Sequence, residues 1–194
     1  MPMQPDGLRE ALTILGEILE DRGHHFELVL VGGGALNLVG LIRRPTKDLD
    51  VVARIEDQAW VSATPLPSAL LSAVNDVALA LNLAHDWLNA GPADLFHMGL
   101  PAGFAERTTR EEFGGLTIHL ASRVDQVAFK LYAAADRWPS NSRHLQDLRA
   151  LAPTREELIA SALWCQTHDV SEGFRDVLLR PVLAEFGIDE VPRE

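Results

Sequence analysis

Apolar and polar residues repeat along the chain with two different periods, and these periods separate expected helices from expected strands. In residues 8–19 the apolar side chains recur every three or four positions, which predicts an amphipathic helix. Residues 27–31 form a short apolar run with β-branched side chains, which predicts a buried strand. Three glycines follow; residues 35–39 then predict one or two helical turns, and residues 48–54 predict a second strand.

The middle of the chain predicts one long helix and two further strands. Residues 68–83 have a helical pattern and follow two prolines, with Ser68 as the expected N-cap. Residues 95–100 and 116–120 are short apolar segments that we interpret as strands, the second introduced by a Gly-Gly turn signal.

From residue 122 onward the pattern is helical. Capping sequences with a hydroxyl three residues before a carboxylate begin at Ser122 and Thr154. We therefore predict an α/β fold: a core of residues 1–121 with a small mixed sheet flanked by helices, and a C-terminal helical part of residues 122–194 packed on that core.

Composition places the chain among ordinary globular proteins. It has 194 residues, of which 47% are hydrophobic and 23% charged, enough to bury a core without covalent staples. Its one cysteine, Cys165, excludes an internal disulfide framework and a cysteine-based metal cage. No apolar run reaches the roughly 18 residues of a membrane span, and the first residues lack a signal-peptide pattern. We therefore expect a soluble, cytoplasmic protein with no membrane partner.

The net charge of −11 disfavours general nucleic-acid binding, because phosphate contacts are made mostly by Lys and Arg. The charge is nevertheless uneven along the chain. Residues 43–54 contain four basic and two acidic residues, and residues 106–155 contain eight basic and six acidic residues. Such segments can form a confined anion site, and chance clustering on a solvated surface explains them equally well.

The strongest chemical signal is VGGGALN in residues 31–37, followed by KDLD in residues 47–50. Glycines after a strand let the backbone turn tightly and approach a ligand, and a helix that begins there points its first N–H groups at that ligand. Asp48 and Asp50 are two positions apart, so both carboxylates project from one face of a strand. Such a pair suits Mg²⁺ held together with substrate phosphates.

Each piece of this pattern also has a simpler interpretation. A glycine run alone marks a turn or linker, and Asp-x-Asp alone is common at a solvated strand edge. A dinucleotide-binding fold also has a strand, glycines, a helix and a later acid, but its glycines follow G-x-G-x-x-G and its acid lies at the end of the second strand. A P-loop is excluded, because the chain has no Gly-Lys-Ser/Thr.

The segment VGGGALNLVGLIRRPTKDLDVV (residues 31–52) resembles the signature of the polymerase-β-type nucleotidyltransferase superfamily, most closely its AbiEii/MenAT toxin-like branch. The resemblance implies a sheet that binds a nucleoside triphosphate and two Mg²⁺ ions and transfers a nucleoside monophosphate to a hydroxyl. It assigns Gly33 and Gly34 to the triphosphate turn, and Asp48 and Asp50 to the metals. Further nucleotide contacts are expected from Gly32, Arg43, Thr46 and Lys47, and Arg44 also lies close enough along the chain to contact phosphates. A solvated loop accounts for the three basic residues equally well.

A second stretch extends the resemblance. FKLYAAADR (residues 129–137), followed by HLQDL (residues 144–148), is similar to a helical K-L-x-A…D-R…(H/K)-x-x-D-L pattern of that branch. The resemblance assigns Lys130 to the triphosphate and Asp147 to the active site. Lys130 is expected in an apolar helix, where a lysine either reaches water or meets an anion. Arg137, seven residues later, is expected on the same helix face and near the nucleotide.

Several alternatives remain open at the level of the sequence. Asp94 or Asp147 supplies the third carboxylate that polymerase-like members use as a base, or that base is missing. Asp147 can equally form a helix-surface ion pair with Arg143 or His144. The acceptor is the 3′ end of tRNA, with the chain as a toxin and a cognate antitoxin as partner, or it is another hydroxyl. The alternatives to this enzyme are a catalytically silent binding or regulatory relative and, ranked last, a dinucleotide-cofactor enzyme.

Overall fold

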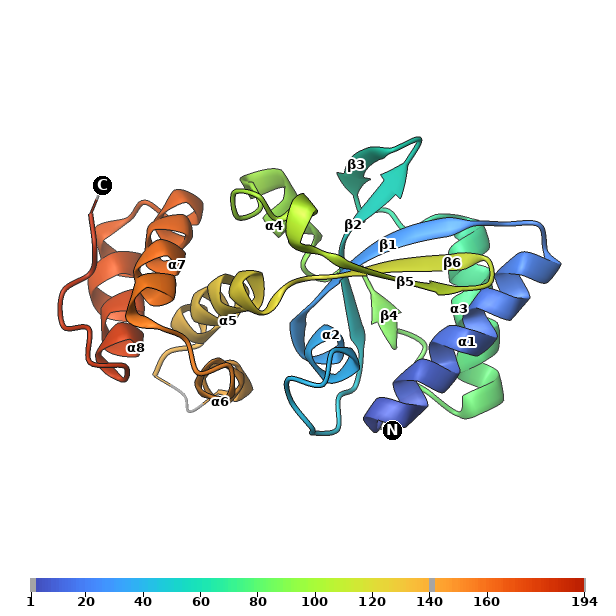
Figure 1. Cartoon of the computed structure of the whole chain (residues 1–194), viewed down its shortest axis with the longest axis horizontal. Helices are drawn as coiled ribbons and strands as arrows, with labels where there is room; N and C mark the ends of the chain where they lie inside the picture. The colour runs from blue at the N-terminus through green and yellow to red at the C-terminus, as the bar shows by residue number, and fades with distance from the viewer. Residues whose placement is uncertain (1–2, 140–141, 194) are drawn as a thin grey trace. The chain divides into compact units, whose positions relative to one another are not determined.

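The computed structural model of the chain describes residues 3–139 and 142–193 and has a mixed α/β architecture (Figure 1). The chain forms two compact units, one of Met1–Leu100 with Phe104–Ala121 and one of Pro101–Gly103 with Ser122–Glu194. The first unit contains a mixed sheet with helices around it, and the second is helical. The predicted fold class is therefore confirmed.

The sheet of the first unit has the strand order β3-β2-β1-β6-β5, and a short sixth strand, β4, also pairs with β2. The central strand, β1, runs antiparallel to β2 and parallel to β6. The bounds are β1 (Phe26–Val31), β2 (Leu49–Glu56), β3 (Ala59–Ser62), β4 (Leu88–Asn89), β5 (Thr109–Phe113) and β6 (Leu116–Leu120).

Two helices of this unit, α1 (Pro5–Asp21) and α3 (Ser68–Leu81), contact each other and pack on the sheet (Figure 1). They share one apolar core with alternate residues of β1 and β6, which lie on the same sheet face because side chains alternate along a strand. The stripe predicted for α1 is confirmed, since these residues are fully buried: Leu8, Leu12, Leu15 and Leu19. The remaining helices of the unit are α2 (Gly32–Leu38), α4 (Ala93–Met98) and the 3₁₀ turn η1 (Ala105–Arg107).

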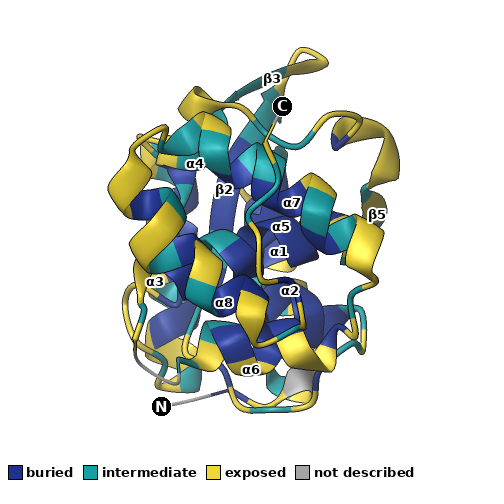
Figure 2. Cartoon of the chain, turned by 90° about the vertical axis from the view of Figure 1, so that its left-hand side faces the viewer, coloured by how far each residue is buried: buried dark blue, intermediate teal, exposed yellow. Residues whose placement is uncertain are grey.

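The second unit is built around α5 (Arg123–Asp136), which contacts the other helices of the unit and is buried along most of its length (Figure 2). Both predicted caps are confirmed. The Ser122 hydroxyl accepts the N–H of Asp125, and Thr154 forms a complete capping box. The other elements are α6 (Arg143–Ala150), α7 (Arg155–His168), the π-helical η2 (Phe174–Leu179) and α8 (Arg180–Ala184).

Three sequence-based expectations differ from the structure. Residues 95–100 do not form a strand, because Pro92 and the acidic residue after it favour the start of helix α4, and Gly99, with φ of 104°, ends it. Helix α2 begins at Gly32 rather than at Ala35, so the glycines form its first turn. The N-cap of α3 is the proline before Ser68. In the described part of the chain, no helix is long and apolar enough to cross a membrane.

Candidate nucleotide and metal site

The glycine turn joins the end of β1 directly to the first turn of α2. Gly32 has φ of +78°, a left-handed conformation that glycine adopts without the penalty paid by other residues. The N–H groups of Gly33 and Gly34 lie in the first turn of the helix, outside its i to i−4 ladder, at the positive end of the helix dipole. This backbone geometry suits an anion.

Each glycine of the turn has a close neighbour. A Cβ atom added at Gly32 would lie 2.5 Å from Oδ2 of Asp50, and one at Gly33 would lie 2.8 Å from Nη2 of Arg44. A Cβ atom at Gly34 would lie 2.4 Å from a methyl carbon of Leu49, in the Asp-x-Asp segment. Because the three glycines have no side chains, the carboxylate of Asp50, the guanidinium of Arg44 and the start of β2 can lie close to the turn.

Strand pairing explains why Asp50 lies at this turn. Asp50 is the second residue of β2 and pairs with Val31, the last residue of β1, immediately before the glycines. Asp48 precedes β2, and its carbonyl oxygen would lie 2.8 Å from a Cβ atom at Gly34. Both aspartates are partly exposed to solvent. The carboxylate of Asp50 thus lies directly against a turn rich in backbone N–H groups, and the backbone of Asp48 lies beside the same turn.

No third carboxylate of the described residues joins this pair. Asp94 is exposed in the first turn of α4. Among residues 3–139 and 142–193 there is no group of three or more His, Cys, Asp or Glu side chains placed to hold a metal ion.

The basic loop before β2 is fixed to α2 by Asn37. The buried amide of Asn37 donates to the carbonyl oxygen of Arg44 at 2.8 Å, and the N–H of Arg44 donates to Oδ1 of Asn37 at 3.3 Å. This anchoring carries the Arg44 guanidinium to Gly33. Arg43 and Lys47, the other two basic residues considered from the sequence, are exposed instead. No local sequence signal distinguishes Arg44 from Arg43, because the difference comes from the amide of Asn37.

Thr46 is buried and shapes the same loop. Its backbone forms a bridge with Met3, and its hydroxyl donates to the carbonyl oxygen of Asp48 at 3.4 Å. The hydroxyl would lie 3.6 Å from a Cβ atom at Gly33. Thr46 therefore lies at the turn, as expected for a nucleotide contact, and also supports the backbone that presents Asp48.

In the second unit, Lys130 of α5 and Asp147 of α6 form a buried ion pair. Nζ of Lys130 lies 2.8 Å from Oδ2 of Asp147, and only 4% and 2% of these side chains are exposed. The anion expected for a buried lysine is thus Asp147 itself. The helix-surface position left open for Asp147 is wrong, because the carboxylate is buried between helices of its own unit.

Arg137 does not share the environment of Lys130. Helix α5 ends at Asp136, and Arg137 is the C-cap residue with an exposed side chain. Its guanidinium lies 3.5 Å from the carboxylate of Asp136. Lys130 is buried and Arg137 is exposed, and the expectation that the two line one side of a phosphate cleft stays a prediction.

A family model described as "Nucleotidyltransferase of unknown function (DUF6036)" matches residues 9–147 of the chain. The chain belongs to this family. Searches of curated proteins and of solved structures give no match. Membership in a nucleotidyltransferase family confirms the broader resemblance, and the AbiEii/MenAT branch stays a prediction. The segment that matches the DUF6036 family contains the glycine turn, both aspartates and the Lys130–Asp147 pair.

The donor set at the turn of this DUF6036 chain fits Mg²⁺. Magnesium is usually held by one or two carboxylates and completes its octahedron with water and substrate phosphates. Asp48 and Asp50 supply two carboxylates, and the space that a Cβ atom at Gly32 would fill contains Oδ2 of Asp50. Phosphate oxygens bound at the glycine turn would provide the missing ligands.

Proposed function

We propose that the chain is a Mg²⁺-dependent nucleotidyltransferase that moves a nucleoside monophosphate from a nucleoside triphosphate to an acceptor hydroxyl. The observation that carries this proposal is the contact between Oδ2 of Asp50 and the Gly32 position at the start of α2. It joins a carboxylate ligand and a phosphate-binding backbone in one place. Membership in a nucleotidyltransferase family supports the proposal.

The residues at the turn have distinct tasks in this reaction. The backbone N–H groups of Gly33 and Gly34 hold phosphate oxygens, and the guanidinium of Arg44 offsets their negative charge. Asp48 and Asp50 hold the metal, and Thr46 keeps the loop before them in place. Bound Mg²⁺ supplies charge neutralisation between the carboxylates and the phosphates.

The transfer is an in-line displacement. A bond forms between the acceptor oxygen and the α-phosphorus, the bond from the α-phosphorus to the pyrophosphate oxygen breaks, and the acceptor releases its proton to Asp48, Asp50 or water. This protein does not need to form a covalent intermediate, so positioning and charge account for the catalysis.

Lys130 and Asp147 have a supporting role in this proposal. Each satisfies the charge of the other in a region closed to water, so neither is available to a substrate while the pair is intact. This differs from the roles that the resemblance assigned to them. Arg43, Lys47 and Arg137 are exposed and can contact a nucleotide only from solvent.

The finer part of the proposal concerns the acceptor and partner. We infer that the acceptor is the 3′ end of tRNA, that two Mg²⁺ ions take part, and that a cognate antitoxin restrains the chain as a toxin. The support is the resemblance of residues 31–52 and 129–148 to the AbiEii/MenAT branch.

Incubation of the purified chain with each labelled nucleoside triphosphate, Mg²⁺ and total tRNA tests the proposal. Asp50→Asn and Asp48→Asn keep the side-chain shape and remove the charge, so each is expected to reduce transfer at least about 100-fold, since a metal ligand supplies several kcal/mol of stabilisation. Asp21→Asn is the matched control, an exposed aspartate of the same unit that lies outside the proposed site and should keep full activity. Chelation of Mg²⁺ should abolish transfer.

A catalytically silent relative is the second candidate, and the lack of a third carboxylate among the described residues favours it. Metal-dependent binding of a nucleoside triphosphate, with no transfer to tRNA, to protein or to small hydroxyl compounds, would establish that function and contradict the first. Loss of transfer in Asp94→Asn would instead identify the missing base.

A further inference from the structure

The second unit has a groove of about 650 Å³ outside the segment that matches the family. The groove is formed by the start of α7, by η2, by the start of α8 and by residues 189–193. Four arginines and three acidic residues line it, and only Val191 and Pro192 are apolar. In a chain with a net charge of −11, this is a locally reversed balance of charge. The four arginines are Arg155, Arg175, Arg180 and Arg193.

One of these arginines is neutralised and orders the groove. Nε and Nη2 of Arg175 donate to the two carboxylate oxygens of Asp176 at 2.9 and 2.8 Å, a bidentate pair. This pair holds the pKa of Asp176 below its usual range, with smaller contributions from the positive charges of Arg193 and Arg180. Asp176 is therefore an anion surrounded by three guanidinium groups.

Two other arginines keep their positive charge. Nη1 of Arg155 donates to the carbonyl oxygen of Gly187 at 3.2 Å, and Nε of Arg180 donates to the carbonyl oxygen of Asp189 at 3.0 Å. A carbonyl group orients a guanidinium without cancelling its charge, and the remaining N–H donors of each fork stay available. In addition to hydrogen bonding, which is the larger cause, the positive charge of Arg155 lowers the pKa of Glu156, and that of Arg180 lowers the pKa of Asp176.

We propose that this groove binds the phosphodiester backbone of single-stranded RNA, an inference that rests on the proposed function because it assigns a binding site for the proposed RNA acceptor. Oriented guanidinium forks match the geometry of phosphate oxygens. Protein interfaces have apolar, aromatic centres, whereas nucleic-acid interfaces are polar and positively charged. The lining of the groove, with four arginines against three acidic residues and only two apolar residues, is of the second kind.

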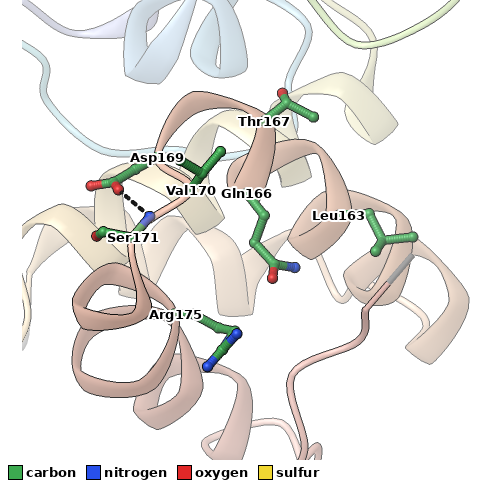
Figure 3. A pocket seen from close by; sticks show the side chains of 7 residues that line it. All are labelled: Leu163, Gln166, Thr167, Asp169, Val170, Ser171 and Arg175. Atoms are coloured by element: carbon green, nitrogen blue, oxygen red, sulfur yellow. Dashed lines mark hydrogen bonds between the residues drawn. The ribbon is translucent and has the colours of Figure 1, made fainter.

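A neighbouring pocket is the reason that a single strand, and not a duplex, is proposed. It has a volume of about 310 Å³ and shares Arg175 with the groove (Figure 3). One wall comes from α7, with Leu163 and Gln166, and the other comes from the segment after it, with Val170. Mixed apolar and hydrogen-bonding walls suit an unstacked base, which a duplex does not offer.

Gln166 links the pocket to the groove. Its Nε2 donates to the carbonyl oxygen of Ala162 at 3.0 Å and to that of Pro192 at 2.9 Å. The second bond holds Pro192, which lines the groove, to a residue of helix α7 that lines the pocket.

Fluorescence anisotropy of a labelled 12-nucleotide RNA, measured over a range of salt concentrations, tests this proposal. Arg155→Gln/Arg180→Gln should raise the Kd about tenfold at low salt and reduce the slope of log K against log salt by about 1.4, since each phosphate contact to a single strand contributes about 0.7. The matched control is Arg22→Gln/Arg110→Gln, which removes two exposed arginines of the first unit that pair with Asp76 and Glu112. It should change the Kd less than about twofold, and the same RNA in a duplex should bind more weakly than the single strand.

Three results would refute RNA binding by the groove. They are no RNA binding by the unaltered chain, equal losses of RNA affinity in the two double variants, or competition by polyglutamate as strong as by unlabelled RNA. The last result would indicate an acidic protein as the partner. Asp48→Asn/Asp50→Asn separates this inference from the proposed function, because that variant should bind RNA normally. If the chain binds RNA through the groove but transfers no nucleotide, the proposed function is refuted and the RNA-binding groove is supported. If Arg155→Gln/Arg180→Gln keeps both transfer and RNA binding, only the RNA-binding role of the groove is refuted.

Discussion

The buried Lys130–Asp147 pair allows a test that separates stability from catalysis. Asp147→Asn removes one charge and leaves the Lys130 ammonium in a region where the lysine side chain is only 4% exposed. Two unit charges 2.8 Å apart attract each other by about 6 kcal/mol at an effective dielectric constant of about 20. Much of this attraction offsets the desolvation of the two groups, so its loss is measured mainly as the penalty on the remaining charge.

We expect Asp147→Asn and Lys130→Met each to lower the free energy of unfolding by about 3–5 kcal/mol, the usual cost of removing one partner of a buried pair. Urea unfolding followed by circular dichroism measures this change. The control is Asp76→Asn, which breaks an exposed ion pair with Arg22 and should cost at most about 1 kcal/mol. A cost below about 1 kcal/mol for Asp147→Asn would refute the argument.

The double variant Lys130→Met/Asp147→Leu replaces both charges by apolar side chains. Such replacements are neutral or stabilising in well-packed interiors, so most of the loss should be recovered. If the recovered protein still transfers nucleotides, neither residue is catalytic. If it is stable and inactive, the roles that the resemblance gave to Lys130 and Asp147 are restored and the supporting role is refuted.

Three further outcomes are expected. Gly32→Ala should lower stability by at least about 1–2 kcal/mol and reduce transfer, because φ of +78° disfavours alanine and the Cβ atom of alanine would meet Asp50 at 2.5 Å. The control is Gly7→Ala in helix α1, where an added Cβ atom would meet no neighbouring atom within 4 Å. This variant should be neutral or stabilising in thermal unfolding. Thr154→Ala should cost about 1 kcal/mol in urea unfolding, because it removes the capping box of α7. Burial raises the pKa of the Cys165 thiol, so at pH 9 iodoacetamide should label this thiol only as fast as the chain unfolds. The stability contributed by the protonated thiol should fall as the pH rises above the ordinary thiol pKa of about 8.5. Rapid labelling of the native chain would contradict this reasoning.

The parts of the fold that the sequence predicted are those where local pattern and burial agree. Helix α1 has its apolar stripe on the core side, and strands β1, β2 and β6 are apolar runs in the centre of the sheet. The caps at Ser122 and Thr154 were predictable because a side chain and a backbone group three residues apart determine them.

Strands β3 and β5, which the sequence did not predict, lie at the edges of the sheet. Their residues are only partly buried, so no pattern of apolar residues marks them in the sequence. Strand β5 has the sequence TREEF, and its charged residues protect an edge that apolar residues would expose to aggregation. Strand β3 follows a tight turn at Asp57 and Gln58, both with positive φ, residues that carry no glycine signal. The error at α4 has the opposite cause, since its apolar residues resemble a strand and only the flanking Pro92 and Gly99 indicate a helix.

The site shows the same division between local and long-range information. The spacing of Asp48 and Asp50 and the glycine run were visible because they are properties of one segment. The position of Arg44 depends on the amide of Asn37, and the partner of Lys130 lies 17 residues away on another helix. Contacts of this kind depend on tertiary packing. A single sequence therefore suggests several possible partners for a residue but does not determine which of them it contacts.

The match to the family ends at Asp147, and this divides the chain by expected function. The glycine turn, the two aspartates and the buried pair all lie within residues 9–147, whereas Arg155, Arg180 and the groove lie beyond them. Transfer chemistry is therefore expected to be common to the family, and RNA binding through the groove to be a property of this chain. A chain cut after residue 147 would not separate the two, because α5 also packs on α7 and would lose part of its burial. Substitutions in the groove, which leave α5 covered, are for this reason the cleaner way to divide acceptor binding from catalysis.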